Sequence, residues 1–203
     1  MKKLIHMFIL TTVLVLAACG GDNSNNNTES NQGPATNAIS EGIEPFEATT
    51  QNGDTMTLED LNGKWWVANF VFTNCTTVCP PMTRNMKVLQ DKLGEESIEN
   101  VQLVSFSVDP ERDTPEVLTE YANDHGADFV NWSFLTGYDF ETIKNISMNS
   151  FKSMLMEPPE GDDQITHTVA FFLVNPEGEV VSKFDGTKAD DMDAIVAELK
   201  ELQ

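Results

Sequence analysis

The sequence has few positive charges, few thiols and few imidazoles. Its 203 residues include 12 Lys and Arg against 33 Asp and Glu, which gives a formal net charge of −21. So acidic a surface disfavours binding to nucleic acid and direct adsorption to anionic lipid. The apolar run at residues 4–18 is shorter than the roughly 20 residues that a transmembrane helix needs. The chain has no internal repeat. The acidic charge therefore argues against a nucleic-acid-binding domain. Any thiol or imidazole chemistry depends on only three cysteines and three histidines.

The N-terminus resembles a bacterial lipoprotein signal. Lys2 and Lys3 precede the apolar run, which ends in Leu16-Ala17-Ala18-Cys19-Gly20 and resembles a lipobox. We expect residues 1–18 to be a signal peptide whose cleavage leaves Cys19 as the lipidated first residue; an uncleaved anchor is the alternative. Several acyl chains give stable anchoring. We therefore expect a lipid anchor at the extracytoplasmic face of the cell membrane, where disulfides persist.

The rest of the chain divides into a tether and one domain. Residues 19–40 are rich in Asn, Ser, Thr and Gly, and we expect a flexible tether there. Residues 41–203 have the usual size of a single domain with a core of its own. We expect this domain to be a monomer.

Apolar patterning predicts the elements of the domain. Asn52-Gly53 separates two short alternating runs and predicts an N-terminal β-hairpin, and Asn175 to Gly178 predicts a second hairpin. We expect strands at 46–50, 55–58, 65–72, 101–108, 131–135, 168–174 and 179–184, and helices at 82–94, from 113 or 114 past 121, at 140–151 and at 190–201. Val117, Leu118 and Tyr121 are expected on one helix face, and Met192, Ile195, Val196 and Leu199 on another.

Helices that alternate with buried strands indicate an α/β domain with a largely parallel central sheet. A pair of cysteines at the junction of the first long strand and its helix is typical of a thioredoxin-like arrangement. We therefore expect a thioredoxin-like α/β fold, with a central sheet that the hairpins make mixed, flanking helices and an N-terminal β-hairpin.

Cys75 and Cys79 are the most informative residues of the chain. If Cys19 is lipidated, any thiol chemistry of the mature protein runs through this pair. Pro80 and Pro81 favour a helix start there, since the first turn does not need their N–H groups. A thiolate at a helix N-terminus is stabilised, so at least one thiol is expected to be reactive.

Four interpretations of the pair remain open from the residues alone. A structural disulfide would close a very short loop and add little stability. Thiol–disulfide exchange usually employs C-x-x-C, one residue shorter, and a cis-proline before a late strand, where this chain has Gln164 to Thr168. A peroxidase is the third interpretation, because Thr76-Thr77-Val78-Cys79 matches the T-x-x-C half of the peroxiredoxin signature. Phe72 stands where that signature has a proline. A metal site with two thiolates favours Cu(I), then zinc.

A metal site needs a third ligand, and His167 is the best candidate because it precedes a buried strand expected to face the dithiol. His6 leaves with the signal, and His125 lies near a helix C-terminus, where a solvated or dipole-stabilised histidine is favoured. Asp109 and Asp113 are possible outer groups, although turn and cap roles explain them equally well. Met154 and Met156 have the thioethers that copper accepts, but core or loop packing is favoured for both.

Three motifs in order then resemble the Sco (SCO/SenC/PrrC) family, Gram-positive lipoprotein type. They are Phe70 to Thr83 with both cysteines, Phe106 to Pro115, and His167 before the late strand. The resemblance implies a thioredoxin-like fold and a copper site, Cu(I) or Cu(II), formed by Cys75, Cys79 and His167. It covers the domain from about residue 41 onward; Thr76 departs from the proline that many members have after the first cysteine.

The resemblance also implies a partner. We expect a copper-binding metallochaperone that assists assembly of the copper A centre on cytochrome c oxidase subunit II, handing over copper by ligand exchange at a shallow, partly exposed loop. The alternative is a thiol–disulfide oxidoreductase that keeps the copper-site cysteines of the oxidase reduced through the redox-active pair Cys75 and Cys79.

Overall fold

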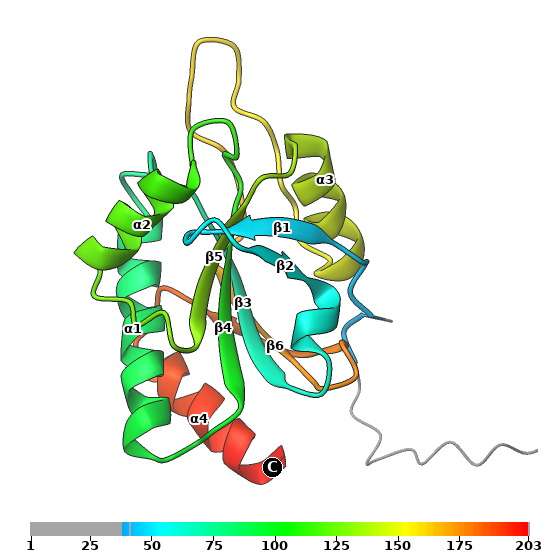
Figure 1. Cartoon of the computed structure of the whole chain (residues 1–203), viewed down its shortest axis with the longest axis vertical. Coiled ribbons are helices and arrows are strands. Elements are labelled where there is room, and N and C mark those ends of the chain that lie inside the picture. Colours follow the sequence, from blue (N-terminus) through cyan, green and yellow to red (C-terminus); the bar gives the residue numbers. More distant parts are fainter. Residues whose placement is uncertain (1–37, 41, 203) are drawn as a thin grey trace, which may run out of the picture. The chain divides into compact units, whose positions relative to one another are not determined.

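The computed structural model describes residues 38–40 and 42–202. Their centre is a seven-stranded sheet in the order β2-β1-β5-β4-β3-β6-β7. The strands are β1 (Glu47–Thr50), β2 (Thr55–Thr57), β3 (Trp65–Val71), β4 (Val101–Ser107), β5 (Trp132–Thr136), β6 (Ala170–Val174) and β7 (Val180–Asp185). The helices are α1 (Cys79–Glu95), α2 (Pro115–Asp124), α3 (Phe140–Asn145) and α4 (Asp190–Leu202), with a 3-10 turn η1 (Leu58–Leu61) and a π-helical turn η2 (Ile146–Ser150) (Figure 1).

The sheet is mixed rather than largely parallel. Only the pairings of β4 with β3 and with β5 are parallel in the described part of the chain. The N-terminal hairpin adds β1 antiparallel to β5, and the second hairpin adds β6 antiparallel to β3. The expected mixed sheet is confirmed, but its parallel part is smaller than expected, because each hairpin contributes two antiparallel strands at an edge.

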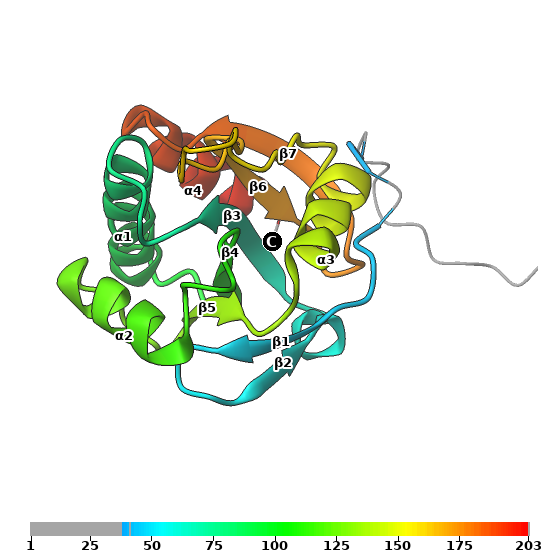
Figure 2. The ribbon, with the colours of Figure 1, turned by 90° about the horizontal axis from the view of Figure 1, so that it is seen from above.

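Helices cover both faces of this sheet. Helices α1, α2 and α4 lie on one face and α3 on the other (Figure 2). Strand β3 alternates between the two cores: Trp66, Ala68 and Phe70 belong to the α3 side, whereas Val67 and Val71 belong to the α1 side. This is the period of two that a strand imposes, and burial on both sides explains the continuous apolar run that predicted β3.

Most expected elements are present, and both hairpins and the inward face of α4 are confirmed. Two expectations were wrong. Val117 is exposed, because the buried face of α2 is formed by Leu118 and Ala122. The helix expected over 140–151 is α-helical only to Asn145; it widens into η2 and ends before Lys152, whose φ is +49°.

The expected signal peptide, Cys19 and most of the tether lie outside the described residues. The last residues of the expected tether already contact the domain: Ile39 N donates to Val180 O at 2.7 Å, and Ser40 is buried. Across residues 38–40 and 42–202 we find no helix whose length and hydropathy would suit a bilayer crossing.

Candidate metal centre

The two thiols lie where β3 gives way to α1. Cys75 is in the connecting loop and Cys79 is the first residue of the helix, followed by Pro80 and Pro81 in the first turn. The Cys79 N–H points at Cys75 Sγ, 3.4 Å away, so the helix terminus donates to the first sulfur. No disulfide joins them. The predicted placement of the dithiol at a helix start is confirmed.

Both thiols are buried, although the loop that carries them is partly exposed, as expected. Cys75 is 6% exposed and Cys79 is fully buried, while the exposed residues of the loop are Thr76 and Thr77. The loop covers its own sulfurs because Phe72 and Val78 pack beside them in the core of the α3 side. Of the two sulfurs, only that of Cys75 belongs to a residue with any exposure, so a partner meets Cys75 first.

The structure brings His167 to this dithiol. Strand β6 runs antiparallel to β3, so the residues before β6 lie at the carboxyl end of β3, where the cysteine loop begins. His167 Nε2 is 3.4 Å from Cys79 Sγ. His167 Nδ1 is 2.7 Å from Thr168 O. A carbonyl only accepts, so Nδ1 carries a proton, and in the neutral ring the nitrogen with the free lone pair is Nε2, the one that faces the sulfur.

The pKa values of the two thiols are shifted in opposite directions. A hydrogen bond from Cys79 lowers the pKa of Cys75 to about 2, against burial, with a further contribution from His167. The same shared hydrogen bond, together with burial, raises the pKa of Cys79. Cys75 also accepts the Cys79 N–H, so it is the more acidic thiol of the pair and the better placed to act as the nucleophile.

A buried carboxylate supports the loop from beneath. Asp113 is fully buried and accepts hydrogen bonds from Thr73 Oγ1 at 2.6 Å and from Ser107 Oγ at 2.5 Å. Thr73 N also points at it, 3.3 Å from Oδ1. Burial raises the pKa of Asp113, and these hydrogen bonds oppose the rise. Asp113 is not the cap of α2; that role belongs to Thr114, whose side chain accepts from Val117 N.

Polar residues that the sequence did not single out connect the neighbouring loops. Asn74 Nδ2 donates to Asp163 Oδ2 at 2.8 Å, and Gln164 Nε2 donates to Asn74 O at 3.3 Å. Arg112 Nη1 lies 3.6 Å from Asp163 Oδ2 and 3.5 Å from Asp109 Oδ2. Parallel β3 and β4 end at the same edge, which is a signal for placing Thr73 and Asp113 together. Asp163 had no such signal, since it lies in a long loop.

The remaining candidates take other places. His125 caps α2 and its Nδ1 donates to Tyr121 O at 2.8 Å, a structural role that agrees with the expectation. Asp109 O accepts the turn hydrogen bonds from Arg112 N and Asp113 N. Met154 and Met156 flank buried Leu155 and are 59% and 50% exposed, so core packing was wrong for both.

The chemistry of the three donor groups fits a metal ion, and so does the distance between Cys79 Sγ and His167 Nε2. Metal–sulfur and metal–nitrogen bonds of about 2.3 and 2.0 Å at a tetrahedral angle place the two ligand atoms roughly 3.5 Å apart. The 3.4 Å between Cys79 Sγ and His167 Nε2 agrees with that spacing. No three His, Cys, Asp or Glu side chains among the described residues form a complete site as they stand.

These features define a class of protein: a thioredoxin-like domain with a reduced C-x-x-x-C pair at a helix start and a histidine against it. The profile of the SCO1/SenC family matches residues 34–203. The chain belongs to the SCO1/SenC family.

Solved structures agree with this assignment. A SCO1/SenC family lipoprotein from Bacillus anthracis is 41% identical with a TM-score of 0.77, covering 82% of this chain and 97% of its own. BsSco, described with a disulfide switch and as a member of the Sco family of cytochrome c oxidase assembly proteins, is 42% identical with a TM-score of 0.73, covering 81% and 94%. ScoI of Arabidopsis thaliana with copper bound is 28% identical with a TM-score of 0.67, covering 79% and 99%. The likeness confirms the expected fold class.

Proposed function

We propose that this protein is a membrane-anchored, extracytoplasmic copper-binding assembly factor. Cys75, Cys79 and His167 bind one copper ion and deliver it by ligand exchange to the copper A centre on subunit II of cytochrome c oxidase. Two observations about relatives support this: ScoI is seen with copper bound, and BsSco is described as belonging to a family of oxidase assembly proteins.

The single observation that carries the proposal is the approach of His167 Nε2 to Cys79 Sγ at 3.4 Å. Because Nδ1 donates to Thr168 O, Nε2 is the ring nitrogen left to bind a metal ion. Two sulfurs and one such nitrogen are a donor set for soft or borderline ions, and three donors suit Cu(I), whereas zinc takes a fourth.

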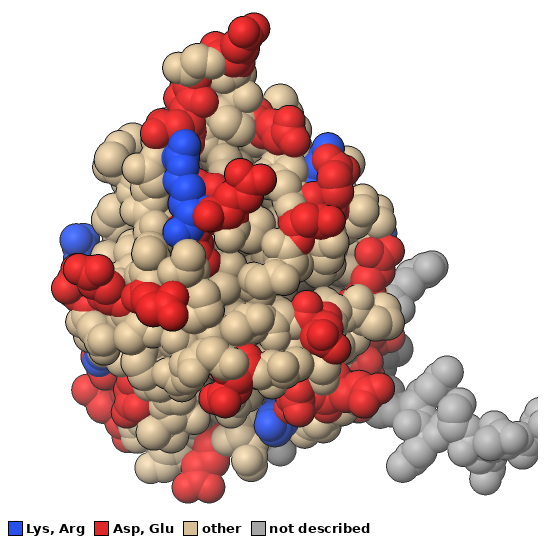
Figure 3. All heavy atoms as spheres, turned by 45° about the horizontal axis from the view of Figure 1, so that its top comes forward, with Lys and Arg blue, Asp and Glu red and all other residues tan. Residues whose placement is uncertain are grey.

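The proposed location rests on the N-terminus and on the surface charge. Lipidation at Cys19 anchors the domain, and residues 19–40 separate it from the bilayer. Asp and Glu side chains predominate on the face seen in Figure 3, with few Lys or Arg among them. An acidic surface of this kind does not adsorb to anionic lipid, so the anchor, rather than the domain, provides membrane attachment.

The test is anaerobic copper titration of the full-length, reduced protein in detergent, with absorption and EPR spectra as readouts. We expect one tight equivalent with sulfur and nitrogen ligation. Loss of an outer ligand partner commonly costs ~10–100-fold in affinity, so His167→Ala should lose at least that much. His125→Ala is the matched control, since it removes an imidazole that bonds to Tyr121, and should bind like wild type. Equal affinity in His167→Ala would contradict the ligand assignment.

A second function, thiol–disulfide exchange with the oxidase cysteines, is favoured by the acidities of the pair. The Cys75 thiolate attacks a partner disulfide, forming a mixed disulfide and releasing one partner thiolate, which takes up a proton. Cys79 then gives up its proton and attacks Cys75 Sγ, so the partner leaves fully reduced and Cys75–Cys79 becomes the disulfide. The two functions separate at His167: exchange should largely survive His167→Ala, and tight copper binding should not.

A further inference from the structure

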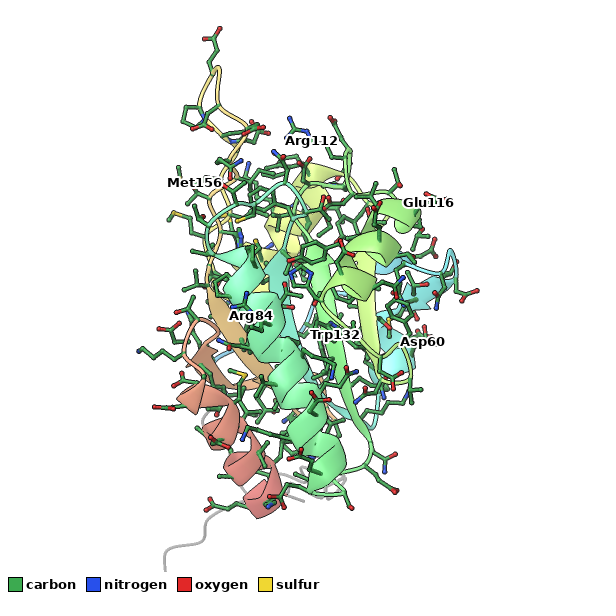
Figure 4. The ribbon with its side chains drawn as sticks, turned by 90° about the vertical axis from the view of Figure 1, so that its left-hand side faces the viewer. Asp60, Arg84, Arg112, Glu116, Trp132 and Met156 are labelled. Carbon is green, nitrogen blue, oxygen red and sulfur yellow. The ribbon has the colours of Figure 1, made fainter. Side chains whose placement is uncertain are left out.

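Three loops meet beside the dithiol and are joined by side chains. We call these side chains, Asn74, Arg112, Asp163 and Gln164, the loop latch. Asp163 is its centre, because it accepts the 2.8 Å hydrogen bond from Asn74 Nδ2 and lies 3.6 Å from Arg112 Nη1. Gln164 adds a bond to the backbone of Asn74 at 3.3 Å. Figure 4 shows Arg112 at the end of the domain where Met156 and the loop before β6 also lie.

The latch joins the segments that present the proposed ligands. Asn74 directly precedes Cys75, and Asp163 precedes His167 by four residues. Four residues reach at most about 14 Å, so fixing Asp163 restricts where the His167 ring can go. At the base of the loop, Met156 and Thr166 form an isolated backbone bridge, and Ile165 packs against the core of the α3 side. Without the latch, residues 157–164 would be held to the domain mainly at that base.

Stability alone does not explain these contacts. The side chains of Arg112 and Asp163 are about half exposed, and ion pairs of that kind contribute little to folding. Their geometric consequence is larger, because they decide whether His167 stays against Cys79 while the exposed part of the cysteine loop moves.

We propose that Asp163 is a positioning residue that holds the His167 loop against the dithiol loop and so favours metal binding over thiol exchange. The inference rests on the proposed copper site. Metal binding needs His167 and both cysteines at one point, whereas exchange needs only the Cys75 thiolate with Cys79 behind it. Breaking the latch therefore weakens the first activity and spares the second.

The variants separate the parts of the latch. Asp163→Ala removes the acceptor for Asn74 and the partner of Arg112. Asp163→Asn keeps an oxygen that can accept from Asn74 but removes the charge facing Arg112. Glu160→Gln is the charge-matched control. Glu160 lies in the same loop, is exposed, and makes no hydrogen bond or ion pair with its side chain in the described part of the chain.

The first readout needs no copper. NMR of the His167 ring in the reduced, metal-free, full-length protein should show Nε2 losing its contact with Cys79 in Asp163→Ala, less so in Asp163→Asn, and not in Glu160→Gln. An unchanged ring signal in Asp163→Ala overturns the latch, whatever happens to copper.

The second readout compares two activities. Copper affinity by competition should fall about tenfold in Asp163→Ala, the low end for outer partners of a metal site, with an intermediate loss in Asp163→Asn. The rate of reducing oxidised glutathione should stay within about twofold of wild type. An equal fall in both activities overturns the proposal, because it would mean general damage to the dithiol. Failure of the wild-type protein to bind copper through sulfur and nitrogen would instead overturn the proposed function and leave the NMR test of the latch decisive.

Discussion

Two carboxylates hold the dithiol loop from different sides, and they differ above all in burial. Asp113 is fully buried and binds Thr73, at the end of β3. Asp163 is half exposed and binds Asn74, the next residue along the chain. Adjacent residues of one loop thus have anchors of the same chemical type in opposite environments.

The two environments shift the pKa values of these carboxyl groups in opposite directions. Burial raises the pKa of Asp113, although its hydrogen bonds oppose the rise. Hydrogen bonds from Gln164 and Asn74 lower the pKa of Asp163, where water limits the opposing cost of burial. A buried anchor is costly to remove because its partners stay buried without a bond; an exposed anchor is replaced by water. Asp113 therefore contributes mainly to the stability of the fold, whereas Asp163 mainly positions the loop.

The largest effect is expected for Asp113→Ala. It leaves the Thr73 and Ser107 hydroxyls and the Thr73 N–H without their acceptor, at a cost of about 3 kcal/mol in unfolding free energy. Urea denaturation followed by tryptophan fluorescence measures this loss. Asp163→Ala, in the same assay, should lower the midpoint only slightly. Similar midpoints for the two variants would remove the distinction between the anchors.

The pH dependence of stability should differ in sign between the two anchors. Because the pKa of Asp113 is raised, the folded protein keeps a proton that the unfolded chain releases. Its contribution is full below the ordinary pKa of 3.8 and is lost as pH rises through the raised value. Relative to Asp113→Asn, wild type should lose stability with rising pH by at most about 1.4 kcal/mol per pH unit.

Asp163 gives the opposite slope, because its pKa is lowered. Relative to Asp163→Asn, wild type should lose stability as pH falls below the ordinary value. Urea titrations at a series of pH values measure both differences. Parallel slopes for the two pairs would show that the environments are not opposite.

The smallest effects come from the partners on the loop itself. Thr73→Val removes one hydroxyl but keeps the shape, and should cost about 1 kcal/mol, since Ser107 and the Thr73 N–H still reach Asp113. Asn74→Ala should not shift the midpoint but should loosen the His167 loop, measurable as faster amide exchange at residues 164–167. A larger stability loss in Asn74→Ala than in Thr73→Val would reverse the assignment of roles.

Much of the fold was predictable because its signals are local. The Asn-Gly turn, the run that is apolar on both faces of β3 and the prolines at the start of α1 each depend on neighbouring residues. The mixed character of the sheet was predicted, but its parallel part was overestimated, since the direction of a hairpin beside β3 depends on which edge it joins. Val117 was misplaced because two adjacent helix positions compete for one narrow buried face.

The site was predictable in its residues and not in its surroundings. Cys75 and Cys79 were predictable from their spacing, and His167 from its position before a buried strand. The contacts of Asp113 and Asp163 cross 40 and 89 residues of chain. No periodicity reports contacts of that range, and Asp113 next to Thr114 and Pro115 is an equally good candidate for a helix cap.

The sequence by itself determined the order of the elements, the dithiol at a helix start and the short list of groups that can bind a soft metal, because these depend on residue type and spacing along the chain. Only the tertiary structure decided that both sulfurs are buried, that Cys75 accepts the Cys79 N–H at the helix start, and that His167 Nε2 faces Cys79. Those properties arise where β3, β4 and β6 bring distant loops to one edge of the sheet, and burial, hydrogen bonding and acidity are set by neighbours in space.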